Sequence, residues 1–253
     1  MLEIRKIKVK GKKKENYYKK ANEKSESIIK FSLDKGEKVL FLGPNGAGKS
    51  SVLKSIAGLE EYQSDSDILL NGKNIEHLSP DKRSKLGIML SFQSPPMIEG
   101  VKVIDFLRTS YNELVEDSMR VDLWSFVELL EELVERVDLD KSFLERDVNL
   151  DFSGGEKKKF ELLQILVLQP TLLLIDEIDS GVDVDSLKII YKVLNDYLSE
   201  RDVSAIIVSH NKDILKSINF DKFLLLKDTE LKEFPDMKVA KKLFDEGFKN
   251  AEI

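Results

Sequence analysis

Residues 40–52 read LFLGPNGAGKSSV and join three patterns within one short stretch. The run KVLFL at 38–42 is continuously apolar after its lysine, which is typical of a buried parallel strand. From Ser51 the sequence SVLKSIAGL has the apolar spacing of a helix, and it ends near Gly58. The glycine-rich segment therefore lies at a strand-to-helix turn, and this order of elements predicts an α/β fold.

The turn matches the pattern G-x-x-x-x-G-K-S/T at every fixed position, with Gly43, Pro44, Asn45, Gly46, Ala47, Gly48, Lys49 and Ser50. Glycines allow positive φ angles, so that successive N–H groups converge on phosphate, and the helix adds its positive dipole end. Lys49 supplies a cation for the β- and γ-phosphates, and Ser50 supplies a hydroxyl for Mg²⁺. A turn that merely resembles the motif is the alternative, which the flanking strand and helix disfavour. We expect these residues, together with Ser51, to bind ATP.

A second chemical pattern is the strand LLLIDE at 172–177, which ends in two carboxylates. Ligands in α/β sheets bind at the carboxyl ends of strands. We expect Asp176 to reach the Mg²⁺ shell and Glu177 to orient or deprotonate the attacking water. Two acids that only cap the next segment are the alternative, and the upstream phosphate loop favours the catalytic interpretation.

Other segments of the chain alternate between strand and helix patterns. Apolar positions at Leu2, Ile4, Ile7 and Val9 predict an opening strand whose phase slips near Arg5. Strands are predicted at 87–92, 171–176 and 203–210, hairpins at 67–75 around Asn71-Gly72 and at 223–234, and helices at 160–168, 185–198 and 239–248.

The composition changes at Ser94-Pro95-Pro96, and helical spacing then continues to about Leu139. We therefore interpret residues 94–150 as a helical subdomain inserted into a nucleotide-binding core made of residues 1–93 and 151–253. The core would hold a mostly parallel sheet and an antiparallel β subdomain.

Charge and composition exclude several classes of function. A net charge of −6 gives no general attraction to nucleic acid or to anionic membranes, and the absence of cysteine excludes thiolate metal sites and catalytic thiols. No apolar run is long enough for membrane insertion, and the N-terminus lacks a secretory apolar region, so a cytoplasmic location is expected. The lysine runs 12–14 and 157–159 are interpreted as solvated charges rather than a nucleic-acid surface.

Ser153-Gly154-Gly155-Glu156 lies between the phosphate loop and the acid pair. With these three motifs in this order, the chain resembles the ATP-binding-cassette (ABC) ATPases, although Phe152 replaces the usual leucine of the signature and Glu156 the usual glutamine. The resemblance implies a P-loop core, ATP hydrolysis, and a dimer of two copies packed head to tail. Residues 153–156 of one copy would then close over the ATP that the other copy holds.

The resemblance also assigns roles to residues outside these three motifs. Gln93 matches the glutamine that senses Mg²⁺, Asp183 lies in the loop that crosses the dimer interface, and His210 matches the histidine that contacts the γ-phosphate. Taken alone, His210 would more often be a capping or core histidine, but its position after the last strand reverses that preference. Tyr17 or Tyr18 is a candidate for stacking on adenine, with solvated loop tyrosines an equal alternative.

Three segments, SFQSPPMIEGVKVIDFLR, DFSGGEKKKFELLQ and IDEIDSGVDVDSLK, resemble the SufC-type branch of this family. That branch comprises the ATPases of the SUF iron–sulfur cluster assembly system. The resemblance implies SufB- and SufD-like scaffold partners, which would ligate the cluster that a cysteine-free chain cannot hold. The alternative is the nucleotide-binding subunit of an ABC importer, whose permease is a separate chain. A DNA-repair ATPase fits poorly, since the insertion is too short for coiled coils.

Overall fold

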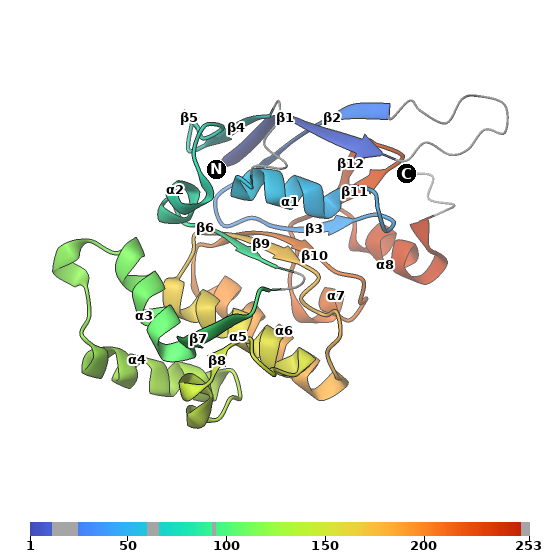
Figure 1. The fold of residues 1–253 in the computed structure, drawn as a ribbon. Coiled ribbons are helices and arrows are strands. Elements are labelled where there is room, and N and C mark those ends of the chain that lie inside the picture. The colour runs from blue at the N-terminus through green and yellow to red at the C-terminus, as the bar shows by residue number, and fades with distance from the viewer. Residues whose placement is uncertain (12–24, 60–65, 93–94, 249–253) are drawn as a thin grey trace.

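The computed structural model describes residues 1–11, 25–59, 66–92 and 95–248 (Figure 1). Gln93, Tyr17, Tyr18 and the lysine run 12–14 lie outside the described residues. The strands are β1 (Leu2–Gly11), β2 (Ser25–Leu33), β3 (Lys38–Leu42), β4 (Asp67–Leu70), β5 (Lys73–Asn74), β6 (Ile88–Ser91), β7 (Ile98–Lys102), β8 (Asp147–Val148), β9 (Leu172–Asp176), β10 (Ser204–Val208), β11 (Lys222–Lys227) and β12 (Glu230–Phe234). The helices are α1 (Lys49–Ala57), α2 (Pro80–Lys85), α3 (Val103–Leu114), α4 (Leu123–Arg136), α5 (Gly154–Leu168), α6 (Val184–Glu200), α7 (Ile214–Ser217) and α8 (Met237–Glu246), with short 3₁₀ turns η2 (Asp117–Met119) and η3 (Lys141–Glu145).

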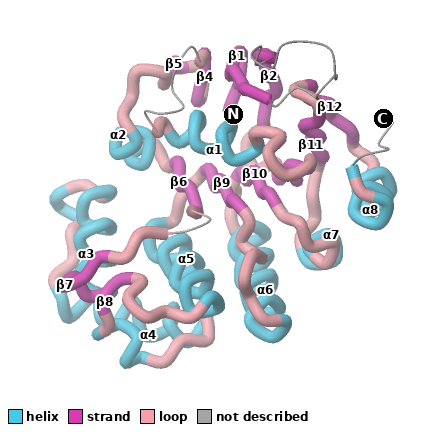
Figure 2. The backbone as a smooth tube through the Cα atoms, turned by 45° about the vertical axis from the view of Figure 1, so that its right-hand side comes forward, coloured by secondary structure: helices cyan, strands magenta, loops and turns pink. Residues whose placement is uncertain are grey.

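A six-stranded sheet in the order β12-β11-β3-β10-β9-β6 forms the centre of the fold. Its neighbouring strands are parallel from β11 to β6, and β12 pairs antiparallel at one edge. A second, antiparallel sheet has the order β2-β1-β4-β5. Figure 2 shows this sheet and α1 on one side of the central strands, and α5 and α6 on the other. The predicted α/β architecture, with a mostly parallel sheet and an antiparallel β unit, is confirmed.

The central strands are apolar throughout because both of their faces are covered. In β3, Val39 and Phe41 pack into the core beneath α1 and the antiparallel sheet, whereas Leu40 and Leu42 pack into the larger core on the helical side. The same alternation along β9 and β10 explains why periodicity in these strands is absent from the sequence. The carboxyl ends of β3, β9 and β10 consequently lie at one edge of a rigid sheet.

The predicted hairpins form with the expected turn geometry. Asn71 and Gly72 have φ angles of 51° and 77°, and Asp228 and Thr229 have 49° and 70°. Two successive residues with positive φ are the requirement of a type I′ hairpin turn. The predicted slip of phase in the first strand is also confirmed, since the pairing of β1 with β2 shifts register between Ile4 and Ile7.

The segment from Ile98 to Val148 is less purely helical than its sequence predicted. It contains α3 and α4, but β7 and β8 pair at its two ends as a small sheet. The prediction missed this sheet because β8 has two residues, β7 contains Gly100, and the pairing is irregular. Helices α3 and α4 pack on α5, so this segment shares the larger core with the rest of the chain.

Arg83 is a fully buried arginine that ties α2 to the end of α1. Its guanidinium donates to the carbonyl oxygens of Ser55 and Ile56 at 2.8 and 2.9 Å, and to those of Leu78 and Glu76, both at 3.0 Å. The Ser55 and Ile56 carbonyls lie in the last turn of α1, where the guanidinium adds to the capping bond from the Gly58 N–H to Ser55 and complements the helix dipole.

We expect Arg83→Ala to lower the free energy of unfolding by about 3 kcal/mol, because several buried carbonyls lose their donor and a cavity remains. Urea denaturation followed by circular dichroism measures this loss. The matched control is Arg120→Ala, which removes an exposed arginine paired with Asp117 and should cost less than about 1 kcal/mol. Equal losses for the two variants would contradict the structural role of Arg83.

Candidate functional site

The predicted phosphate loop leaves the sheet after β3 and enters α1 at Lys49, as its sequence indicated. Gly43, Gly46 and Gly48 have φ angles of 147°, 78° and 108°. A Cβ atom on Gly43 would lie 2.2 Å from the carbonyl oxygen of Leu226 in β11, so glycine is required for the close approach. Gly48 is the N-cap of α1 and offers no side chain, which leaves the N–H groups of the first helical turn available to an anion.

Lys49 lies inside this loop with only 6% of its surface exposed. Its Nζ donates to the carbonyl oxygens of Gly43 at 2.8 Å and Pro44 at 3.1 Å. Burial lowers the pKa of Lys49, and the nearby carboxylates of Glu177 and Asp176 oppose that shift. The ammonium group is therefore held in the loop by neutral oxygens, from which it can transfer to a phosphate.

Ser50 and Asp176 bring α1 and the end of β9 together. The Ser50 hydroxyl donates to Oδ1 of Asp176 at 3.0 Å. Asp176 is 2% exposed, and burial raises the pKa of its carboxyl while the hydrogen bond from Ser50 lowers it.

This oxygen pair fits Mg²⁺, which prefers hard oxygen ligands and usually keeps several waters or phosphate oxygens. Among the described residues, there is no group of three or more His, Asp or Glu side chains that could hold a metal ion. The ion would need ligands from a nucleotide. The third predicted ligand, Gln93, lies outside the described residues.

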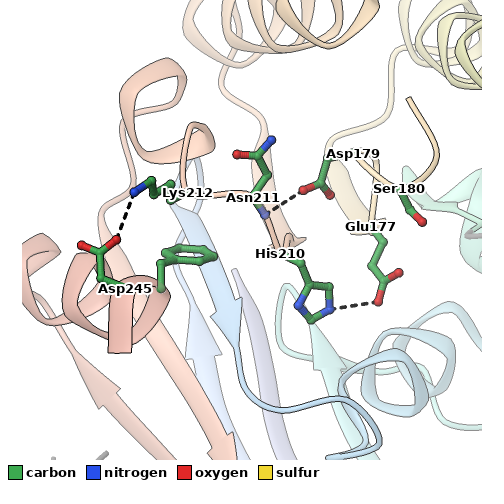
Figure 3. Close-up of a pocket in the computed structure, with 8 residues that line it drawn as sticks. Glu177, Asp179, Ser180, His210, Asn211, Lys212 and Asp245 are labelled. Carbon is green, nitrogen blue, oxygen red and sulfur yellow. Dashed lines mark hydrogen bonds and ion pairs between the residues drawn. The ribbon is translucent and has the colours of Figure 1, made fainter. Parts of the chain in front are cut away.

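Glu177 and His210 meet although they follow different strands (Figure 3). His210 Nε2 lies 3.1 Å from Oε1 of Glu177, and the Glu177 backbone N–H donates to Val208 at the end of β10. Glu177 has a φ of 57°, in the left-handed region that non-glycine residues rarely adopt. The pair lines an open pocket of about 660 Å³, together with Asp179, Ser180, Asn211, Lys212, Phe244 and Asp245. A carboxylate beside an imidazole can accept and hold a proton there.

The motif at 153–156 forms the start of α5 rather than part of this pocket. Ser153 is the N-cap, and its Oγ accepts from the Glu156 N–H at 3.2 Å while Glu156 Oε2 accepts from the Ser153 N–H at 2.7 Å. A Cβ atom on Gly154 would lie 2.2 Å from the Gly181 carbonyl oxygen. The glycines thus allow this helix end to pack directly on loop 180–183. Asp183 ends that loop as the N-cap of α6.

Arg146 supports this motif and was missed by the sequence analysis. Its guanidinium pairs with Glu156, donates to the Asp151 carbonyl oxygen at 3.0 Å, and stacks on the Phe152 ring at 4.7 Å. It lies in irregular chain between η3 and β8, where no periodicity links it to the motif. The pair offsets a negative charge at a helix end that would otherwise repel anions.

The interpretation of the lysine run 157–159 as solvated charges is wrong for Lys158. Lys158 is buried and forms an ion pair with Glu161 at 3.1 Å, and Lys159 pairs with Asp138. The spacing of Lys158 and Glu161 by three residues on one helix could have indicated the pair.

Comparisons with known proteins agree with this geometry. A family model described as "ABC transporter" matches residues 27–180. The chain is 36% identical over 223 residues to "Probable ATP-dependent transporter ycf16" of Cyanophora paradoxa, covering 87% of this chain and 86% of that protein. It is 35% identical over 221 residues to "Probable ABC transporter ATP-binding protein SpyM3_0208" of Streptococcus pyogenes serotype M3, covering 87% and 86%.

Solved structures with the same fold include the ATP-binding cassette MJ0796, described as a dimer bound to ADP and Pi. Its TM-score is 0.76 at 18% identity, covering 93% of this chain and 98% of that one. The ADP form of the cassette MJ1267 has a TM-score of 0.69 at 19% identity, covering 97% and 94%. Within the described parts of the chain, no helix has the length and apolarity needed to cross a membrane. The chain therefore belongs to the ABC transporter family of ATP-binding proteins, and it is an ATP hydrolase.

Proposed function

We propose that this ATPase binds Mg-ATP between two copies of the chain and drives a conformational change in a SufB/SufD-type iron–sulfur assembly scaffold. The observation that carries the catalytic part is the meeting of Lys49, Asp176 and Glu177 at the carboxyl ends of β3 and β9. Lys49 and the backbone N–H groups of residues 43 and 45–51 hold the triphosphate. Ser50 and Asp176, with Gln93, hold Mg²⁺, which neutralises phosphate charge when bound.

In this proposal Glu177 accepts a proton from the attacking water, and His210 contacts the γ-phosphate. The 3.1 Å approach of His210 Nε2 to Glu177 Oε1 supports these roles, because it orients the carboxylate toward the pocket. A positioned base typically contributes about 10²–10⁴-fold to a rate.

The separation of the motif at 153–156 from the pocket favours a site shared between copies. Ser153 is exposed at the start of α5, where helix N–H groups and the serine hydroxyl can meet an anion. Val184, beside Asp183, is 70% exposed although it is apolar, as expected for a residue that another copy covers. We therefore propose that residues 153–156 and Asp183 of one copy complete the ATP site of the other.

Mixing two inactive variants tests the shared site. Lys49→Ala and Ser153→Arg chains are each expected to lack turnover alone, whereas their heterodimer should recover one working site because both lesions fall in the other site. ATPase assays on tag-purified heterodimers measure the recovery. Because Ser153→Arg also removes a helix cap, Asp122→Ala, which uncaps α4, is the matched control and should keep its turnover. An inactive heterodimer of proven composition would contradict the shared site.

The SufC-type assignment rests on the three resembling segments and on a surface beside Gln93. Phe92 and Met97 are 40% and 56% exposed, and Phe92, Pro95 and Pro96 line an apolar pocket of about 150 Å³. A scaffold segment that docks here would contact residues that neighbour Gln93, the proposed Mg²⁺ ligand, in the sequence. The absence of cysteine is consistent with a scaffold that ligates the cluster itself.

The alternative function is that of an importer subunit acting on a separate permease. The name "ABC transporter ATP-binding protein" of the streptococcal relative favours it. Affinity purification of the tagged chain from its native cells, followed by sequencing of the partners, distinguishes the two. A SufB-like protein is the expected partner, and a polytopic membrane protein in its place would contradict the assignment.

A further inference from the structure

Asp179 connects the acid-pair strand to the loop that carries His210. Its Oδ2 accepts hydrogen bonds from the Ser209 hydroxyl and from the Asn211 backbone N–H, both at 2.9 Å. Ser209 and Asn211 are the two chain neighbours of His210, and Figure 3 shows the bond to Asn211 beside the His210–Glu177 pair. From this geometry we infer that Asp179 is a positioning residue, which holds His210 against Glu177. The inference rests on the roles proposed above for these two residues.

Further hydrogen bonds around Asp179 join the residues on either side of His210. The Asn211 N–H also reaches the Ser209 hydroxyl at 3.1 Å, and that hydroxyl lies 3.2 Å from the Asn211 carbonyl oxygen. Ser209 is only 2% exposed, so water competes weakly for these bonds. A single carboxylate oxygen thus binds the side chain of the residue before His210 and the backbone N–H of the residue after it.

Asp179 is also tied to Glu177, because it lies two residues later in the same turn. The Ser180 N–H donates to the Glu177 carbonyl oxygen at 3.2 Å, which closes that turn. Glu177 and Asp179 therefore belong to one turn, and the hydrogen bonds that Asp179 accepts link this turn to the His210 loop. The His210 side chain is 36% exposed. Without the bonds to Asp179, the orientation of its imidazole would depend on the contact with Glu177 alone.

The second oxygen of Asp179 faces a buried tyrosine. Oδ1 of Asp179 and the hydroxyl of Tyr191 are both shielded from solvent, and neither has a hydrogen-bond partner among the described residues. Burial, with the Asp179 carboxylate next in importance, raises the pKa of Tyr191, so its hydroxyl stays protonated. An asparagine could keep its amide oxygen on the loop and place its NH₂ against Tyr191.

Removal of the carboxylate should affect turnover rather than nucleotide affinity. Asp179→Ala leaves Ser209 and Asn211 without their common acceptor, so we expect kcat to fall about 10–100-fold. The KM for ATP should stay within about threefold of the wild-type value, because the phosphate loop follows β3 whereas Asp179 follows β9. Asp179→Asn should restore at least about a third of the wild-type kcat. Asp213→Ala is the control, since it removes an exposed carboxylate that pairs with Lys216 rather than with Ser209 or Asn211, and its kcat should stay within about twofold.

The double variant Asp179→Ala/His210→Ala separates positioning from a general loss of structure. If Asp179 acts through His210, the double variant should be no slower than His210→Ala alone. Thermal unfolding monitors whether each variant is folded at the assay temperature. The inference would be overturned if the fold-decreases in kcat of the two single variants multiplied in the double variant. It would also be overturned if Asp179→Ala were folded and turned over ATP at the wild-type rate. Wild-type turnover in His210→Ala would instead overturn the proposed site itself.

Discussion

Replacement of Lys49 with alanine is expected to lower ATP turnover about 10³-fold and to weaken ATP binding. The ammonium group is buried in the phosphate loop, where it donates to the neutral carbonyl oxygens of Gly43 and Pro44. A phosphate that enters the loop gains this cation at close range. One such charge pair is worth roughly 4 kcal/mol at about 4 Å and an effective dielectric near 20, which corresponds to about three orders of magnitude.

Steady-state hydrolysis and equilibrium binding of a fluorescent ATP analogue measure the two effects. Lys242→Ala provides the control, because it removes an exposed lysine on α8 that is paired with Glu246. The control should retain wild-type turnover. If Lys49→Ala hydrolysed ATP at a rate near that of the wild type, the assignment of residues 43–50 as the phosphate site would be wrong.

Glu177→Gln is expected to reduce hydrolysis by about 10²–10⁴-fold while preserving ATP binding. The amide oxygen can keep the contact with His210 that Oε1 makes at 3.1 Å, but it cannot accept a proton from water. Nucleotide should therefore remain bound without being consumed. Under the proposed shared site, an ATP-bound dimer should accumulate.

Size-exclusion chromatography with saturating Mg-ATP detects that dimer, and rapid-quench assays detect the lost chemical step. Glu113→Gln, which neutralises an exposed acid paired with Lys85 on the surface, should behave as the wild type in both assays. A Glu177→Gln chain that stays monomeric with ATP bound would count against the shared site. Unchanged hydrolysis would count against Glu177 as the base.

Elements with local signals were predicted from the sequence with little error. The glycine-rich turn between β3 and α1 and the hairpin at Asn71-Gly72 each depend on backbone conformations that a few neighbouring residues impose, so their patterns are readable without the fold. The small sheet of β7 and β8 was missed, because its strands lie far apart in the chain and are too short for a period. Lys158 was misinterpreted because burial depends on what covers a helix face.

The sequence by itself determined which chemical groups this protein carries and which local turn presents each of them. Lys49 follows a glycine loop, and Asp176 and Glu177 follow a buried strand, for reasons contained within a few residues. Only the tertiary structure decided which groups meet. His210 reaches Glu177, and Asp179 binds both neighbours of His210, because β9 and β10 are adjacent and in register in the sheet. Strand order and register depend on the packing of the whole core, so no local pattern encodes them.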